Sequence, residues 1–247
     1  MDIGNSLLGW VRRVPPLVGL LLVAACATAR TDNGQIPPSA MIGSAFEAGA
    51  KARVIADGKP VEFSTVSPGD IEIPSGRIVV CDPFACDPGI PFTKAVPTGR
   101  FPVQLAVARA PSGEQQVAYA RILFSARPAV RWEMALPPGE SIDGSQTNYA
   151  FGFPVESGTG SFMDATVQEP YLAAAADPNT KRQLIAALNE HQTSGATWLV
   201  RPFGPGTVAM FSTGFGDGYY ISYFGLDDAG RIVSLTTDLG VIERPRS

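Results

Sequence analysis

The sequence contains little histidine: His191 is the only one among 247 residues. A single histidine, in a stretch predicted to be helical, argues against a Ser-His-Asp catalytic relay and excludes histidine-rich metal sites. The chain also lacks the G-x-x-x-x-G-K-[ST] motif of P-loop nucleotide-binding proteins. The run Gly214-x-Gly216-x-Gly218 precedes a predicted strand rather than a helix, so it is not a dinucleotide-binding fingerprint. The remaining candidates for chemistry are carboxylates in glycine-rich loops.

Cysteine is also scarce, and one of the three cysteines follows a short apolar stretch, residues 17–25. That stretch is far shorter than the roughly 20 apolar residues of a spanning helix, and a basic segment precedes it, as in a signal peptide. The sequence Leu22-Val23-Ala24-Ala25-Cys26 resembles the lipobox of bacterial lipoproteins. This resemblance implies removal of residues 1–25 and attachment of lipid to Cys26. An ordinary secretory signal with an incidental cysteine is the alternative.

A lipidated Cys26 predicts an exported protein that is anchored to the cell membrane or the outer membrane, with its domain facing the periplasm or the exterior. Ala27, after the cysteine, is compatible with the outer membrane. Residues 26–40 are small, polar and proline-containing, which is typical of a flexible tether. Residues 41–247 show no internal repeat, so we expect a single globular domain.

The other two cysteines, Cys81 and Cys86, are separated by four residues. In an oxidising compartment such a pair predicts one disulfide, with free thiols and a metal site as alternatives.

Basic residues are outnumbered, because 19 Lys and Arg face 23 Asp and Glu, and only four of the basic residues are lysines. Without residues 1–25 the balance is 17 to 22, a net charge of −5. An acidic chain without a basic stripe is repelled by a phosphate backbone. We therefore exclude DNA and RNA as partners.

Short apolar runs separated by Gly, Pro and Asp predict an α+β domain made mostly of antiparallel sheet. The predicted strands before the helical region are Arg53–Ile55, Val61–Val66, Ile71–Ile73, Arg77–Val80, Phe101–Val107, Gln116–Ser125 and Val130–Ala135. The last of them places Trp132 and Met134 on one face.

One or two helices are predicted within about residues 169–192, the second capped by Asn179 or Thr180. Three further β-rich runs predict a C-terminal antiparallel meander, with Asp217-Gly218 as one of its turns: Thr207–Thr213, Tyr219–Leu226 and Arg231–Thr237.

Several short motifs occur in order along the chain: Gly76, Asp82-Pro83, Pro91-Phe92, Val96-Pro97-x-Gly99-x-Phe101-Pro102-Val103, Phe124-Ser125, Arg131-Trp132-Glu133-Met134-Ala135, Ser157-Gly158-Thr159-Gly160-x-Phe162-Met163-Asp164, Gly214-x-Gly216-Asp217-Gly218 and Gly225-Leu226-Asp227. Taken together, these motifs resemble the bacterial family called domain of unknown function 4241. The resemblance covers about residues 76–240 and implies no established activity. In this chain Glu156 stands where an aspartate is expected before the small-residue run.

The candidate site lies in Val155–Ala165, where Glu156 and Asp164 flank a run of five small residues. Gly158 and Gly160 would let the backbone form a concave loop whose N–H groups face one point. The two carboxylates would supply oxygen ligands for a divalent cation, Ca²⁺ or Mg²⁺. The alternative is a tight turn with solvated acids. Three more acids would join the site if the fold brings them together: Asp217, Asp82 and Glu133.

Two functions follow from these residues. The first is a lipid-anchored envelope module that uses its acidic glycine-rich loops to bind a cation, a small ligand or an envelope protein. The second is a metal-dependent hydrolase in which Glu156, Asp164 and Asp217 hold an ion that activates water.

Overall fold

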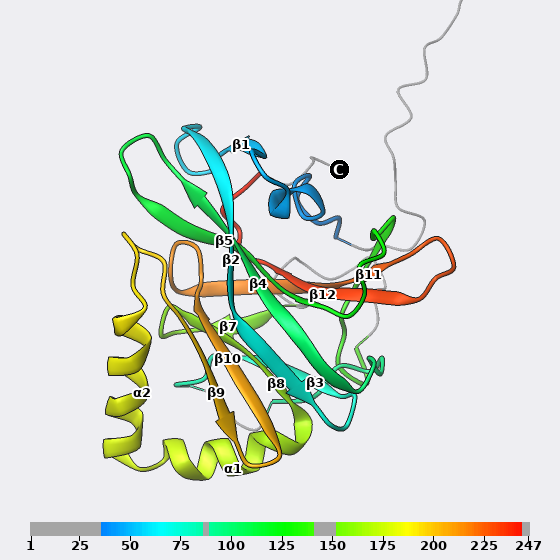
Figure 1. Ribbon diagram of the computed structural model, residues 1–247, viewed down its shortest axis with the longest axis vertical. Coiled ribbons are helices and arrows are strands. Elements are labelled where there is room, and N and C mark those ends of the chain that lie inside the picture. Colours follow the sequence, from blue (N-terminus) through cyan, green and yellow to red (C-terminus); the bar gives the residue numbers. More distant parts are fainter. Residues whose placement is uncertain (1–35, 86–88, 141–151, 244–247) are drawn as a thin grey trace, which may run out of the picture.

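The computed structural model describes residues 36–85, 89–140 and 152–243. The fold is α+β as predicted, with two antiparallel sheets and two α-helices (Figure 1). The predicted signal peptide, Cys26 and Cys86 lie outside the described residues, so lipidation and the disulfide stay predictions. Within the described ranges, no helix is long and apolar enough to cross a membrane.

The larger sheet has eight strands and includes the hairpins β4–β5 and β11–β12. Its order is β1-β2-β4-β5-β12-β11-β6, and β7 also pairs with β11. The bounds are β1 Lys51–Arg53, β2 Pro60–Ile73, β4 Gly99–Arg109, β5 Gln115–Leu123, β6 Arg131–Met134, β7 Phe153–Val155, β11 Gly218–Leu226 and β12 Ile232–Asp238.

Strand β2 corrects the prediction of two short strands separated at Ser67-Pro68-Gly69. It runs without interruption, and its register with β4 shifts between Val66 and Gly69. Such an irregularity lets a strand carry a proline, which has no N–H to donate to the ladder. The proline and glycine therefore mark a bulge inside the strand and not its end.

The smaller sheet has the order β3-β8-β10-β9, with β3 Ile78–Cys81, β8 Thr159–Asp164, β9 Trp198–Phe203 and β10 Gly206–Ser212. All three C-terminal strands of the predicted meander are present, but β10 pairs with β8 and β9, while β11 pairs with β12. The chain crosses between the sheets at residues 213–217, where Gly214 has a φ of +44° and a Cβ would meet the Leu239 carbonyl oxygen at 2.4 Å. The predicted meander is therefore divided between the two sheets at this crossing, and Gly214 is a position that a side chain could not occupy without a shift of the backbone.

The two helices, α1 Ala165–Ala175 and α2 Pro178–Glu190, pack on the outer face of the smaller sheet (Figure 1). The cap of α2 differs from the prediction, because the Asp177 carboxylate accepts from Thr180 N at 3.0 Å. Pro178 is then the first helical residue, where a missing N–H costs nothing.

The main apolar core lies between the sheets, and a second core covers the opposite face of the larger sheet. Residues 36–46, including a 3-10 turn at Ser44–Phe46, pack onto this second core. Ser39, which the sequence places in the tether, is 1% exposed, and its N–H donates to Asp238 Oδ2 at 3.1 Å. The packed part of the chain thus begins before residue 41.

Candidate functional site

Asp82 lies directly after β3 and holds the loop that precedes β8. The residue is 3% exposed. One carboxylate oxygen accepts from Glu156 N at 2.9 Å and from Ser157 N at 2.7 Å. The other oxygen accepts from Ser157 Oγ at 2.6 Å and from Phe84 N at 2.8 Å. Asp82 thereby ties two segments that are more than 70 residues apart in the sequence.

In the loop at Glu156–Gly158, two consecutive N–H groups, those of Glu156 and Ser157, donate to one oxygen of the Asp82 carboxylate. Gly158 occupies the left-handed region with a φ of +65°. Gly160 has another role, because it lies inside β8, where a Cβ would approach the Phe211 ring to 2.9 Å. Only the first of the two glycines therefore shapes the loop.

Asp164 ends β8 and caps α1. Its fully buried carboxylate accepts from Thr166 N at 2.9 Å and Thr166 Oγ1 at 2.7 Å. On the other side it accepts from Ser75 N at 2.9 Å and Ser75 Oγ at 2.8 Å. An N-cap carboxylate of this kind satisfies the free N–H groups of the first helical turn. The side chain also fixes the turn between β2 and β3.

The other three candidate acids lie apart from this carboxylate. Glu156 and Asp217 are exposed, and Asp217 lies in the turn before β11. Glu133, on β6, forms ion pairs with Lys94 and with Arg131, the latter at 2.5 Å. These contacts give Glu133 two cationic partners within the chain.

The predicted cluster is therefore only partly assembled. The structure brings Asp82 and the turn that contains Asp217 to the Glu156 loop, since β7 pairs with β11 at Val155 and Gly218. Glu156 precedes β8, whereas Asp164 is the last residue of that strand. The six residues of that strand span roughly 16 Å at about 3.3 Å per residue. Across the described residues, no group of three or more His, Cys, Asp or Glu side chains is placed to hold a metal ion.

A pocket of about 350 Å³ lies beside Asp82 and is named here the Asp82 pocket. Its walls come from the end of β3, the segment before Phe92, the segment that follows β6, and strands β7 and β11. Most of the lining is apolar, including Val80, Ile90, Phe92, Ala135 and Phe153, and its polar side chains are those of Asp82, Glu140, Tyr220 and Ser222.

Most polar groups of this pocket already have partners. The Tyr220 hydroxyl lies 2.7 Å from the Gly216 carbonyl oxygen, and Ser222 Oγ lies 2.8 Å from Thr237 Oγ1. Burial raises the pKa of Tyr220, so its hydroxyl stays protonated at neutral pH. Burial also raises the pKa of Glu140 at the edge of the pocket. The pocket is suited to an apolar ligand and offers few unpaired hydrogen-bonding groups.

The sequence offered little signal for the lining of this pocket. Ile90 stands alone between Gly89 and Pro91, outside any apolar period, and 64% of its surface is exposed. Tyr220 and Ser222 alternate with Ile221 on β11 and thus share the pocket face. An isolated isoleucine between a glycine and a proline was the one clue in the sequence that could have drawn attention here.

The comparisons with known proteins identify a family and no activity. The model of the family described as "Protein of unknown function (DUF4241)" matches residues 71–237. Searches of curated proteins and of solved structures found no match. The match spans more than half of the chain and agrees with the resemblance of the short motifs. The chain belongs to the DUF4241 family.

Proposed function

We propose that this protein is a lipid-anchored binding protein of the bacterial cell envelope that takes a small, largely apolar ligand in the Asp82 pocket. The observation that carries the proposal is the pocket itself, with its volume of about 350 Å³ and its mostly apolar walls. Small-molecule sites are typically concave cavities of roughly 300–1,000 Å³ with a few placed polar groups.

The arrangement of the acids favours binding over metal-dependent hydrolysis. In the hydrolase alternative Glu156, Asp164 and Asp217 would need to reach one ion. Asp164 already accepts hydrogen bonds from Ser75 and Thr166, and β8 separates it from Glu156. Asp82, similarly, stabilises the wall of a pocket through its contacts with Ser157. Asp82 is best explained as a support of the loop before β8, and Asp164 as the N-cap of α1.

The pocket can be tested with a neutral apolar fluorescent probe, N-phenyl-1-naphthylamine, whose emission rises when it leaves water. We expect saturable binding of one probe per purified full chain. Ile90→Asp places a charge on an exposed lining residue, so it should weaken probe binding about tenfold or more without unfolding the protein.

Ile55→Asp is the matched control, because Ile55 is also an isoleucine, is 54% exposed and lies outside the pocket lining. This control should bind the probe like the unchanged chain. Absence of saturable binding, or equal weakening by both substitutions, would contradict the pocket assignment.

The anchor is tested separately with Cys26→Ser in the native host. The lipidated protein should partition with membranes and incorporate labelled palmitate, and the substitution should abolish the label. Palmitate incorporation that is unchanged by Cys26→Ser would refute lipidation at this residue and would leave the pocket proposal standing.

A further inference from the structure

A second pocket, of about 300 Å³, lies on the opposite face of the larger sheet and is named here the Arg121 pocket. Arg121 on β5 and Trp132 on β6 line it, as do Phe46 from the 3-10 turn and Arg127 from the loop after β5. Successive side chains of a strand point to opposite faces. Ile122 accordingly faces the core between the sheets, while Arg121 faces this pocket.

Arg121 is half-buried and lacks an acidic partner in the described ranges. Its guanidinium carbon lies 3.7 Å from the centre of the Phe46 ring, and Nε donates to Gln104 Oε1 at 2.8 Å. Glu47 lines the same pocket but forms no ion pair with Arg121 within 4.0 Å. The two terminal nitrogens, which form the fork suited to an oxyanion, make no hydrogen bond and no ion pair with the described residues.

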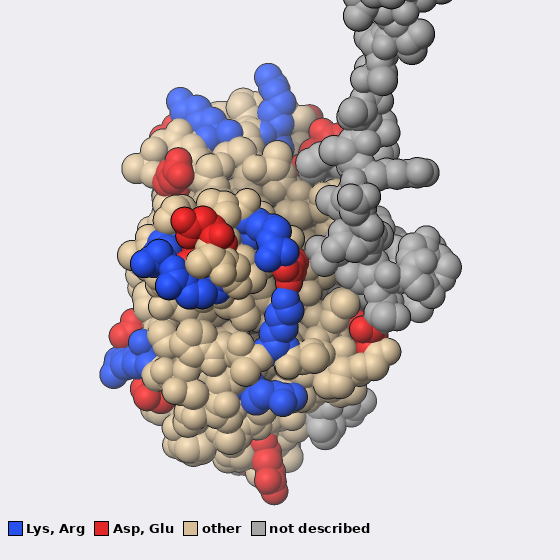
Figure 2. All heavy atoms as spheres, turned by 90° about the vertical axis from the view of Figure 1, so that its right-hand side faces the viewer, with Lys and Arg blue, Asp and Glu red and all other residues tan. Residues whose placement is uncertain are grey.

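The neighbouring arginines differ in this respect. On the face seen in Figure 2, toward which the β11–β12 hairpin of Figure 1 projects, Lys and Arg side chains lie among Asp and Glu side chains. Arg231 contacts Asp227 at 2.7 Å, Arg131 contacts Glu133 at 2.5 Å, and Arg127 lies 4.0 Å from Asp227. These exposed arginines have carboxylate partners, whereas the more buried Arg121 does not. Burial of an unpaired charge is unfavourable unless a ligand or another group compensates it.

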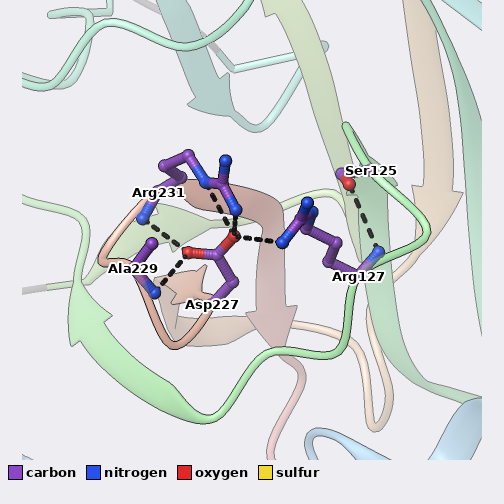
Figure 3. A network of polar contacts seen from close by, with 5 residues as sticks. All are labelled: Ser125, Arg127, Asp227, Ala229 and Arg231. Atoms are coloured by element: carbon purple, nitrogen blue, oxygen red, sulfur yellow. Dashed lines mark hydrogen bonds and ion pairs between the residues drawn. The ribbon is translucent and has the colours of Figure 1, made fainter.

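Arg127, which lines the Arg121 pocket, is held by contacts with residues outside the pocket. Figure 3 shows the Asp227 carboxylate between Arg231 and Arg127, with the backbone N–H groups of Ala229 and Arg231 directed at it. Ser125 Oγ accepts from Arg127 N at 3.2 Å and so fixes the start of the loop. The β11–β12 hairpin therefore orients Arg127 at the edge of the pocket.

We propose that the Arg121 pocket is a second binding site, which receives the oxyanion of a small aromatic ligand on the Arg121 guanidinium and the ligand's ring against Trp132. The cation remains charged at neutral pH, although burial lowers the pKa of Arg121 to about 10. Two parallel N–H···O bonds to a carboxylate or phosphate group give both affinity and orientation. The Trp132 side chain supplies a large apolar surface at the same pocket.

The test is a titration of the ¹⁵N-labelled full chain in which the indole N–H resonance of Trp132 is followed by NMR. Benzoate and phenyl phosphate distinguish a carboxylate from a phosphate ligand, and benzyl alcohol is the neutral counterpart. We expect saturable shifts of the Trp132 resonance with at least one of the two anions, and binding of benzyl alcohol that is about tenfold weaker or weaker still.

Arg121→Met removes the charge and retains an unbranched apolar chain against Phe46, so it should weaken anion binding about tenfold. Arg201→Met is the matched control, because Arg201 is exposed on β9 in the other sheet. If Arg121→Met does not fold, Arg127→Gln at an exposed position still tests the site and should also weaken the anion. Failure of both anions to bind, equal binding of the alcohol, or unchanged affinity in the Arg121 and Arg127 variants would overturn the proposal.

Discussion

The Asp82 pocket and the Arg121 pocket lie on opposite faces of the same eight-stranded sheet and differ in their polar groups. In the first, the Asp82 carboxylate accepts four hydrogen bonds from the chain, and the hydroxyls of Tyr220 and Ser222 lie close to partners. In the second, the Arg121 cation has an aromatic ring and an amide as neighbours but no carboxylate. The first pocket should therefore select ligands by shape and apolar surface, and the second by charge.

Asp82→Ala should affect the Asp82 pocket and not the Arg121 pocket, and it should cause the largest loss in the free energy of unfolding. The substitution leaves the N–H groups of Phe84, Glu156 and Ser157 without their acceptor, so we expect a loss of about 3 kcal/mol in the free energy of unfolding. Urea unfolding measures the loss, and probe binding should fall only in the Asp82 pocket. Asp217→Ala, at an exposed acid, is the control, and an equally small effect of both substitutions would refute the supporting role of Asp82.

Gly225→Ala should disturb the opposite face. A Cβ at this position on β11 would meet the Trp132 ring at 2.9 Å and Ser234 Oγ at 2.5 Å. Overpacking of this kind costs about 2 kcal/mol and should displace the indole, weakening anion binding at Arg121.

Gly43→Ala is the comparison for Gly225→Ala, because its Cβ would lie 3.7 Å from the same ring, an ordinary contact distance. Thermal unfolding should show a clear shift for Gly225→Ala alone. Equal shifts for the two variants would show that Trp132 is not tightly packed over Gly225.

Asp227→Asn, close to the Arg121 pocket, should change how the free energy of unfolding depends on pH. The side-chain hydrogen bond from Arg231 lowers the pKa of Asp227 below its ordinary value of 3.8. A lowered pKa contributes stability that is complete above 3.8 and is lost as the pH falls through the folded value. The variant should therefore lose less stability than the unchanged chain when urea unfolding is compared at pH 6 and pH 3.

Asp228→Asn, at the exposed neighbouring acid, is the control for this pH effect. It should follow the pH profile of the unchanged chain. If Asp227→Asn follows that profile as well, the Arg231–Asp227 contact does not contribute to folding.

Glu156→Ala should have the smallest effect of the four. Its side chain is exposed, and the loop is held by backbone N–H groups that the substitution retains. We expect a change of less than about 0.5 kcal/mol in unfolding free energy and unchanged probe binding. Stabilisation of the unchanged chain by Ca²⁺ or Mg²⁺ that disappears in Glu156→Ala would contradict this account and revive the cation site.

The fold class could be predicted because strand and helix patterns are local. The hairpin β4–β5 and the strand carrying Trp132 and Met134 are where alternation and turn residues place them. The pairing of β10 with β8 could not be predicted, since these two strands lie more than 40 residues apart in the sequence. In the same way, Pro68 resembles a strand end in the sequence but lies within β2 because of the register shift.

The candidate site was predicted less well than the fold, for a related reason. The sequence drew attention to the loop at Gly158, but the N–H group of Glu156 in that loop donates to Asp82, more than 70 residues away. A buried carboxylate that caps a loop and one that binds a metal have the same local sequence. Arg121 was overlooked, although a lone arginine between Ala120 and Ile122 in an apolar strand is a recognisable signal.

The most direct test of the two-pocket account is a map of backbone amide shifts in the full chain, recorded with N-phenyl-1-naphthylamine and then with benzoate. We expect the neutral probe to shift the backbone amide resonances around Ile90, Phe153 and Tyr220. Benzoate should shift those around Phe46, Arg121 and Trp132, each set responding independently of the other. One common set of shifted amides for both compounds would contradict it.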